Sequence, residues 1–182
     1  MRTILNSITS AAIVVAAIAS APAMAATQGT LGATSTGTVA ISASVPNRAR
    51  ITGLADVAFT SQDPNTAASS AQSVCVWSNT ATKGYTVTAS GSGTSSAFTL
   101  ANGLLTVPYS VAWNASSGAT TGTALATGTA SAGLVSTATQ QVCSSSPATT
   151  SSLVDGITTA DLGGMQAATS YTGTLTLVVT PQ

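Results

Sequence analysis

The chain has 182 residues with only 4 Lys+Arg and 4 Asp+Glu, no histidine and a formal net charge of zero. So few cations leave no basic surface for binding nucleic acid or an anionic membrane. The absence of histidine excludes Ser-His-Asp and Cys-His catalytic arrangements, and two cysteines alone cannot make a zinc site. With 44% hydrophobic residues and no net charge, the composition favours a folded domain over a disordered stalk.

The acid/base inventory is limited to four aspartates, because the chain contains no glutamate: Asp56, Asp63, Asp155 and Asp161. A glycosidase can work with two aspartates, but no two of these lie in a recognisable motif. We therefore expect them to serve at the surface or as caps, and we expect no enzymatic activity. No EF-hand spacing, phosphate loop or dinucleotide fingerprint is present, so no cofactor or metal is expected either.

The first 25 residues have the organisation of an export signal. Met1 and Arg2 precede a mainly apolar run over residues 4–21, and residues 23–25 read A-M-A, the small-x-small pattern of a signal peptidase site. A membrane helix is the alternative, but the uninterrupted apolar part is shorter than the ~20 residues that a bilayer requires. The sequence thus predicts a mature chain that starts at Ala26, has no transmembrane span and is secreted or periplasmic.

The stretch 38–45 reads T-V-A-I-S-A-S-V and follows a Gly/Thr/Ser-rich leader over residues 26–37. Its alternation predicts a strand with one buried face, formed by Val39, Ile41, Ala43 and Val45. Pro46 ends the strand because proline has no N–H to donate. Periodicity does not reveal which molecule buries that face: the strand either opens a closed β-sandwich or is donated to a neighbouring copy.

The remaining chain, 46–182, has the length of one domain. Strands are predicted at 50–59, 72–77, 84–90, 97–101, 105–114 and 170–180. We expect a bulge at Gly53, a hairpin joining 72–77 to 84–90, and an edge strand or a bulge at Pro108.

The pattern is weaker in the second half of the domain, before the last strand. It predicts a short strand within 123–126, an extended stretch at 134–143 and a loop at 144–152. The type of 154–168 stays open, with a short helical turn expected near Asp161. Many short strands and no helical period favour an all-β, immunoglobulin-like sandwich.

Two cysteines, Cys75 and Cys143, remain in the exported chain. An even pair in an oxidising compartment most simply forms one disulfide, which would restrict the unfolded chain by roughly 4 kcal/mol. Cys75 and Trp77 share one face of their strand, so the indole is expected to pack against the bridge.

Four segments together resemble the subunits of chaperone–usher pili. They read T-V-A-I-S-A-S-V-P, S-V-C-V-W-S-N-T-A-T-K-G-Y-T-V-T-A-S, V-P-Y-S-V-A-W and Y-T-G-T-L-T-L-V-V. The chain is most similar to the spore coat protein U domain group and to the colonisation-factor (alpha) class of fimbrial subunits.

This resemblance implies an immunoglobulin-like sandwich that lacks its final strand and is completed by the N-terminal strand of another copy. It implies a periplasmic chaperone and an outer-membrane usher as partners, a role in adhesion or biofilm formation, and donor residues Val39, Ile41, Ala43 and Val45. The alternative is a secreted or surface-associated closed β-sandwich that binds carbohydrate or serves as a coat protein. Aromatic residues make up only 4% of the chain, and most occupy core-like positions, which disfavours sugar stacking.

Overall fold

The computed structural model describes residues 25–182, so the expected signal peptide, 1–25, lies outside the described residues except for Ala25. The chain divides after Val45 into two units, the second of which is Pro46–Gln182. In the first unit, the only regular pairing among the described residues is an antiparallel bridge between Thr27 and Thr38. Residues 39–45 belong to no strand in this single chain.

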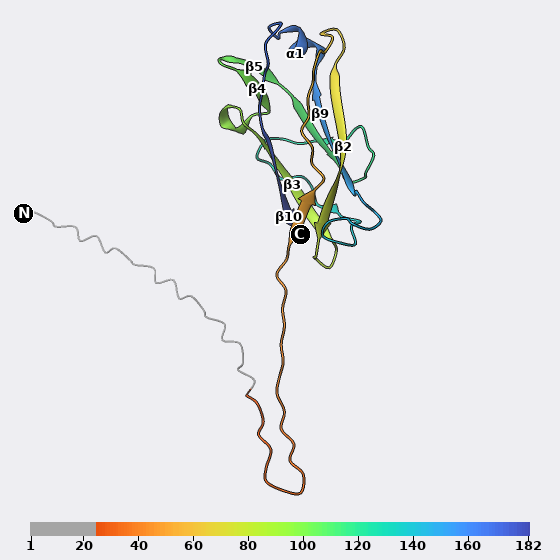
Figure 1. Ribbon diagram of the computed structural model, residues 1–182. Helices are drawn as coiled ribbons and strands as arrows, with labels where there is room; N and C mark the ends of the chain where they lie inside the picture. Colours follow the sequence, from red (N-terminus) through yellow and green to blue (C-terminus); the bar gives the residue numbers. More distant parts are fainter. Residues whose placement is uncertain (1–24) are drawn as a thin grey trace, which may run out of the picture. The chain divides into compact units, whose positions relative to one another are not determined.

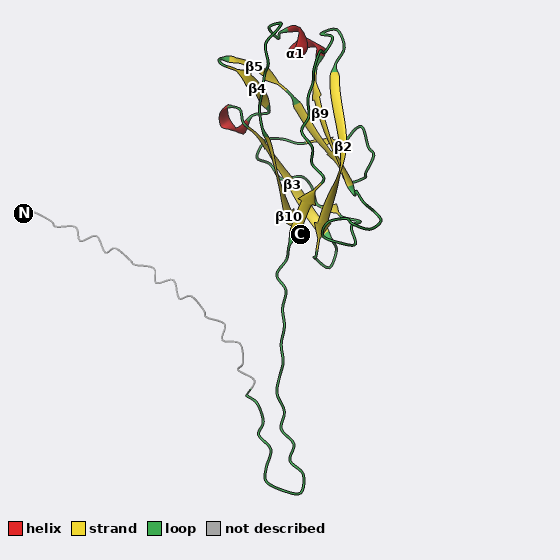
Figure 2. Cartoon of the chain, in the orientation of Figure 1, coloured by secondary structure: helices red, strands yellow, loops and turns green. Residues whose placement is uncertain are grey.

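The second unit is built almost entirely of strands, as Figures 1 and 2 show. The elements are β1 (Ala49–Thr52), β2 (Ala68–Ser78), β3 (Gly84–Gly91), β4 (Thr99–Asn102), β5 (Leu105–Pro108), β6 (Ser110–Asn114), β7 (Thr123–Ala124), β8 (Leu134–Val135), β9 (Ser151–Ile157), α1 (Thr159–Gly163) and β10 (Leu175–Pro181). A single 3₁₀ turn covers Thr94–Ser96. The predicted all-β class is confirmed.

The strands form two main sheets and a hairpin. One sheet has the order β1-β2-β9-β6-β7, the other has the order β10-β3-β8, and β4 pairs with β5. Every strand pair in these sheets is antiparallel. The order means that β10, the last strand, stands at an edge of the three-stranded sheet.

The predicted hairpin between 72–77 and 84–90 is wrong, although both strands exist. β2 pairs with β1 and β9, whereas β3 pairs with β10 and β8. The turn between them carries the chain from one sheet to the other. In this turn Lys83 takes φ 54°, and its N–H donates to Thr80 O at 2.9 Å. The Ser78 hydroxyl also closes the turn by donating to Gly84 O at 2.9 Å.

Two long predicted strands are shorter in the structure. The strand expected at 50–59 ends at Thr52, because Gly53 takes φ +83° and turns the chain out of the β1–β2 ladder. The strand expected at 105–114 is split into β5 and β6 at Pro108, where the missing N–H and fixed φ interrupt the ladder.

The region around β9 differs most from the sequence-based prediction. β9 lies in the centre of the five-stranded sheet between β2 and β6, in a stretch predicted as part loop, part undetermined. The helical turn expected near Asp161 is confirmed as α1. Its N-cap, Thr158, accepts a hydrogen bond from the Asp161 N–H at 3.2 Å, a standard capping interaction.

The main core joins both sheets around Tyr85, whose side chain is fully buried. The core side chains are Val74, Val76, Tyr85, Val87, Ala89, Val111, Trp113, Leu125 and Leu153. The Tyr85 hydroxyl lies 2.9 Å from Ser151 Oγ and accepts from Trp113 Nε1 at 3.3 Å. These bonds satisfy the polar groups that the core encloses.

The predicted disulfide between Cys75 and Cys143 is present, with a Cα–Cα distance of 6.1 Å. It lies on the opposite face of β2 from the main core, in a small cluster with Ala138 and the half-buried Trp77. The bridge therefore fastens the 136–143 loop over the outside of the sheet, and Trp77 packs there as expected.

Candidate functional site

The free edge of β10 is the most unusual feature of the domain. β10 pairs with β3 on one side, and no described strand pairs with its other side. An unpaired edge presents a row of N–H and C=O groups that can accept another strand. β10 thus offers seven residues of open ladder.

The apolar side chains of β10 are incompletely covered. Leu175, Leu177 and Val179 alternate towards the main core, yet all three are only half-buried. On β3, the neighbouring strand, Val87 and Ala89 are fully buried. Burial therefore falls off from the centre of the sheet towards its free edge.

The segment 53–60 follows β1, the strand of the five-stranded sheet that contacts β10 across the two sheets. Figure 1 shows this segment in orange-brown and β10 in dark blue. Leu54 is 48% exposed and Val57 is 37% exposed. We call β10 and 53–60 together the open edge.

One side chain holds 53–60 in place. The Gln72 amide accepts from the Ala55 N–H at 2.8 Å and donates to Ala55 O at 3.1 Å. A side chain here provides the two hydrogen bonds that a neighbouring strand would otherwise provide. Since 53–60 belongs to no strand, most of its backbone is free for another partner.

The predicted donor residues lie in the other unit, and their large side chains are exposed. Val39 is 75% exposed, Ile41 91% and Val45 77%, and Ala43 is exposed as well. Exposed apolar side chains at alternate positions are unusual unless a partner covers them. The described chain thus contains an apolar strand sequence without a sheet and a sheet edge without a neighbour.

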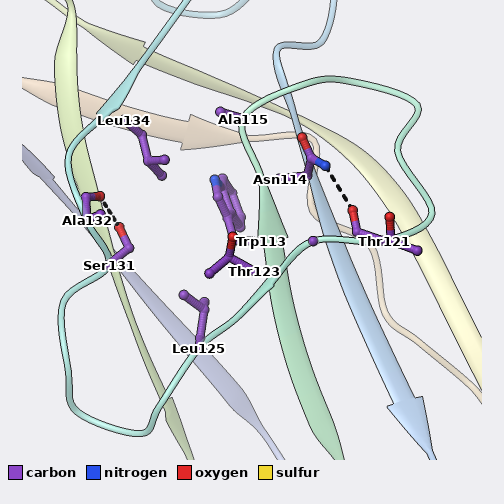
Figure 3. A pocket seen from close by; sticks show the side chains of 10 residues that line it. Trp113, Asn114, Ala115, Thr121, Thr123, Leu125, Ser131, Ala132 and Leu134 are labelled. Carbon is purple, nitrogen blue, oxygen red and sulfur yellow. Dashed lines mark hydrogen bonds between the residues drawn. The ribbon is translucent and has the colours of Figure 1, made fainter.

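A pocket of about 440 Å³ lies elsewhere, around Trp113 (Figure 3). Two of its polar side chains already bind the backbone: Asn114 Nδ2 donates to Thr121 O at 2.9 Å, and Ser131 Oγ donates to Ala132 O at 2.8 Å. Trp113 itself is 3% exposed and offers no open ring face. No charged residue lines the pocket. It lacks the free, convergent polar groups that orient a sugar or another polar ligand.

The aspartates are dispersed over the domain and form no acid pair. Asp63 caps a turn by accepting from the Asn65 N–H at 2.9 Å, and Asp161 accepts from Thr158 Oγ1 at 2.5 Å, so both have the expected capping roles. Asp155 does not: it is 6% exposed, and its Oδ1 has no hydrogen-bond partner among the described residues. Burial raises the pKa of the Asp155 carboxyl to about 6.

In residues 25–182, no group of three or more His, Cys, Asp or Glu side chains could hold a metal ion. Nor does any helix there have the length and apolarity needed to cross a membrane.

No model of a known protein family matches this chain, and no curated protein sequence is significantly similar to it. Sequence reasoning had singled out the donor residues and the last strand, but it missed the exposed Leu54 and Val57. The only sequence signal for the exposure of Leu54 and Val57 was the pattern of the strand predicted at 50–59. The apolar residues of that stretch do not alternate strictly, so they do not define a single buried face. Sequence reasoning also missed the burial of Asp155, because an isolated aspartate carries no sequence signal for burial.

Proposed function

We propose that this chain is a structural subunit of a bacterial surface pilus that polymerises by donor-strand exchange. In this proposal, residues 38–45 of one copy lie along the open edge of the next copy and complete an immunoglobulin-like sandwich. The observation that carries the proposal is that one chain contains two incomplete elements. These are the half-covered β10 edge and the exposed side chains of Val39, Ile41 and Val45.

The two elements correspond in length and pattern. β10 has seven residues, with four alternate positions turned inward, and residues 39–45 carry four alternate apolar residues over the same length. Burying Val39, Ile41 and Val45 contributes roughly 5 to 8 kcal/mol before entropy costs. Backbone hydrogen bonds to β10 and to 53–60 add to this, at about 1 kcal/mol each.

An uncovered edge of this kind aggregates unless another protein protects it. The proposal therefore includes a periplasmic chaperone that covers the edge and an outer-membrane usher where the next copy replaces it. It also includes export through the periplasm to the cell surface and a non-enzymatic role in adhesion or biofilm formation. The resemblance of the strand sequences to chaperone–usher subunits supports these partners.

The test is to move the donor strand within one chain. Deleting residues 38–45 should leave a subunit that its chaperone still binds but that cannot join a filament. Grafting the same segment after Gln182 through a short flexible linker should give a stable monomer, because the effective concentration then reaches the millimolar range. Thermal unfolding and size-exclusion mass report both results.

A matched pair of substitutions makes the test specific. Ile41→Asp in the graft should abolish the stabilisation, since it forces an unpaired carboxylate into an apolar site at a cost of several kcal/mol. Ser42→Asp lies on the opposite face of the same strand and should be tolerated. If the deleted chain without a graft is a soluble monomer with an unchanged melting temperature, the domain is closed and the proposal is wrong.

A further inference from the structure

The cations of the domain are gathered at one end. Arg48 and Arg50 lie at the start of β1, where Ala49 is paired with Ser78 at the end of β2. Lys83 lies in the turn that follows β2. All three side chains are exposed, and none makes an ion pair or a hydrogen bond within the described residues. We call this the basic end. Gln182 lies beside Gly84 at the same end, and a carboxylate there would offset one of the three positive charges.

Two of the aspartates lie at the opposite end. Asp63 is in the turn that leads into β2, and Asp161 is in α1, directly after β9. The first residue of β2, Ala68, pairs with Ile157 at the end of β9, which brings both acids to one end, seen at the top of Figure 1. Each keeps one carboxylate oxygen without a hydrogen bond in the described chain. We call this the acidic end.

The two ends are too far apart to attract each other within one subunit. β2 runs from the acidic end to the basic end with 11 residues, which at about 3.3 Å per residue is roughly 35 Å. The Debye length at physiological ionic strength is about 8 Å. These charges can therefore act only between molecules.

Resting on the proposed function, we infer that consecutive copies meet end to end, with the basic end of one copy against the acidic end of the next. β10 runs from the acidic end to the basic end, because Pro181 pairs with Tyr85 beside Lys83. A strand inserted antiparallel to β10, as in every other strand pair of these sheets, leaves the edge at the acidic end.

The linker is short enough to bring the two ends together. Only Pro46 and Asn47 lie between Val45 and Arg48, so Arg48 stays within about 10 Å of the end of the inserted strand. Parallel insertion would instead bring Arg48 to the basic end of its neighbour, against like charges. The contact is heterologous and repeats along a filament without closing. The charges therefore favour one strand direction and one order of assembly.

A peptide experiment separates this contact from strand insertion. The acceptor is the chain carrying Ile41→Asp, which cannot donate its own strand. Peptides 38–45 and 38–50 are titrated into it. The longer peptide, with Arg48 and Arg50, should bind about three- to tenfold more tightly at about 0.01 M salt and less than twofold more tightly at about 1 M.

Two controls test whether the tighter binding of peptide 38–50 is due to its charge. Peptide 38–50 with both arginines replaced by glutamine should bind like 38–45. An acceptor with Asp63→Asn and Asp161→Asn keeps the side-chain oxygens that accept from Asn65 and Thr158, and it should lose the gain but bind 38–45 normally. A longer peptide that gains nothing, or a gain that persists in this acceptor, overturns the end-to-end contact. If neither peptide binds, the proposed function fails, and this inference fails with it.

Polymerisation of the full chain gives a second readout. Arg48→Glu should slow elongation several-fold at low salt, and adding Asp63→Lys should restore part of the rate. The pair Ala71→Glu and Ala124→Glu changes net charge by the same amount as Arg48→Glu, at exposed sites away from both ends and from the open edge, and should leave the rate unchanged. Elongation that is insensitive to Arg48→Glu, or equally slowed by the control pair, contradicts the contact.

Discussion

Two parts of the same core differ sharply in how completely this chain encloses them. Around Tyr85 the side chains of Val74, Val76, Val87, Val111, Trp113 and Leu153 are buried, and the phenol, Ser151 and Trp113 satisfy one another's polar groups. Along the open edge, Leu177 is half-buried and Leu54 is largely exposed. Both regions use the same kinds of apolar residue, so composition does not explain the difference. What the open edge lacks is a neighbouring strand, and this missing strand is what a second copy is proposed to supply.

The largest expected effect concerns the disulfide on the outer face of β2, behind the closed core. Replacing Cys75 and Cys143 by alanine should lower the free energy of unfolding by roughly 4 kcal/mol on the chain-entropy model, given a sequence separation of 68. Urea unfolding measures it. Chemical reduction of the unmodified chain should give the same midpoint. Because the bridge lies on the outside of β2, the affinity of the folded variant for peptide 38–45 should not change; a weaker affinity would show that the two regions are coupled.

A pair of identical substitutions compares the two regions directly. Leu153→Ala, in the closed core at 3% exposure, should cost about 3 kcal/mol, whereas Leu177→Ala at the half-covered edge should cost about 1 kcal/mol. In the chain with the grafted donor strand, the cost of Leu177→Ala should rise towards that of Leu153→Ala. Equal costs of Leu177→Ala with and without the graft would mean that nothing covers this leucine on insertion.

The third prediction concerns pH. Burial raises the pKa of the Asp155 carboxyl from its ordinary value of 3.8 to about 6, so the folded chain binds this proton more tightly than the unfolded chain. The free energy of unfolding should therefore fall as the pH rises from about 4 to about 6, by about 2 kcal/mol, and stay low above that. Burial and, to a smaller extent, the Asp155 charge raise the pKa of Tyr109 above its ordinary value of 10.0, so Tyr109 remains neutral in this range.

Asp155→Asn provides the control for this pH dependence. The amide has nearly the same shape and does not ionise, so the slope between pH 4 and 6 should disappear in urea unfolding series. A slope that persists in this variant would assign the dependence to another group.

The smallest expected effect concerns the two side-chain hydrogen bonds that hold 53–60 in place. Gln72→Leu removes the two hydrogen bonds to Ala55 and should cost about 1 kcal/mol. Hydrogen exchange should speed up across 53–60, and the amides of β3 should be unaffected. Gln62→Leu, which removes only a local bond to Thr60 O, is the matched control. Equal exchange in the two variants would show that Gln72 does not hold the segment.

The sequence predicted the all-β class and β3 well, because their alternation is strong and local, and it predicted the disulfide because an exported chain with two cysteines can form only one bridge. The last strand was predicted at 170–180 but begins at Leu175. It failed at β9, where Ser151, Ser152 and Asp155 are buried although their side chains are polar. Ser151 is accommodated by Tyr85, 66 residues away, and such a partner leaves no trace in a local pattern. The β2–β3 hairpin was wrong for a related reason: a short turn brings two strands close but does not decide which strands pair.

The candidate site could be predicted only in part. The alternation of Val39, Ile41, Ala43 and Val45 identifies a face that needs covering, but in the proposed assembly the surface that covers it belongs to another copy. The acceptor side depends on which edge of which sheet remains free, and this follows from the position of β10 in the sheet order.

The placement of the few cations also determines how proteases can cut the protein. Trypsin-like enzymes cleave after lysine and arginine, and in residues 25–182 these are only Arg48, Arg50 and Lys83. Lys83 is held in a tight turn by bonds of its own backbone to Thr80 and Ser136, which resists the extended conformation that such enzymes require. Arg50 is held in β1, where it pairs with Trp77 of β2, so the accessible site falls at Arg48, between residues 38–45 and the domain. If the proposed assembly is right, digestion of filaments should release intact domains that begin at Ala49, each still holding the strand of its neighbour.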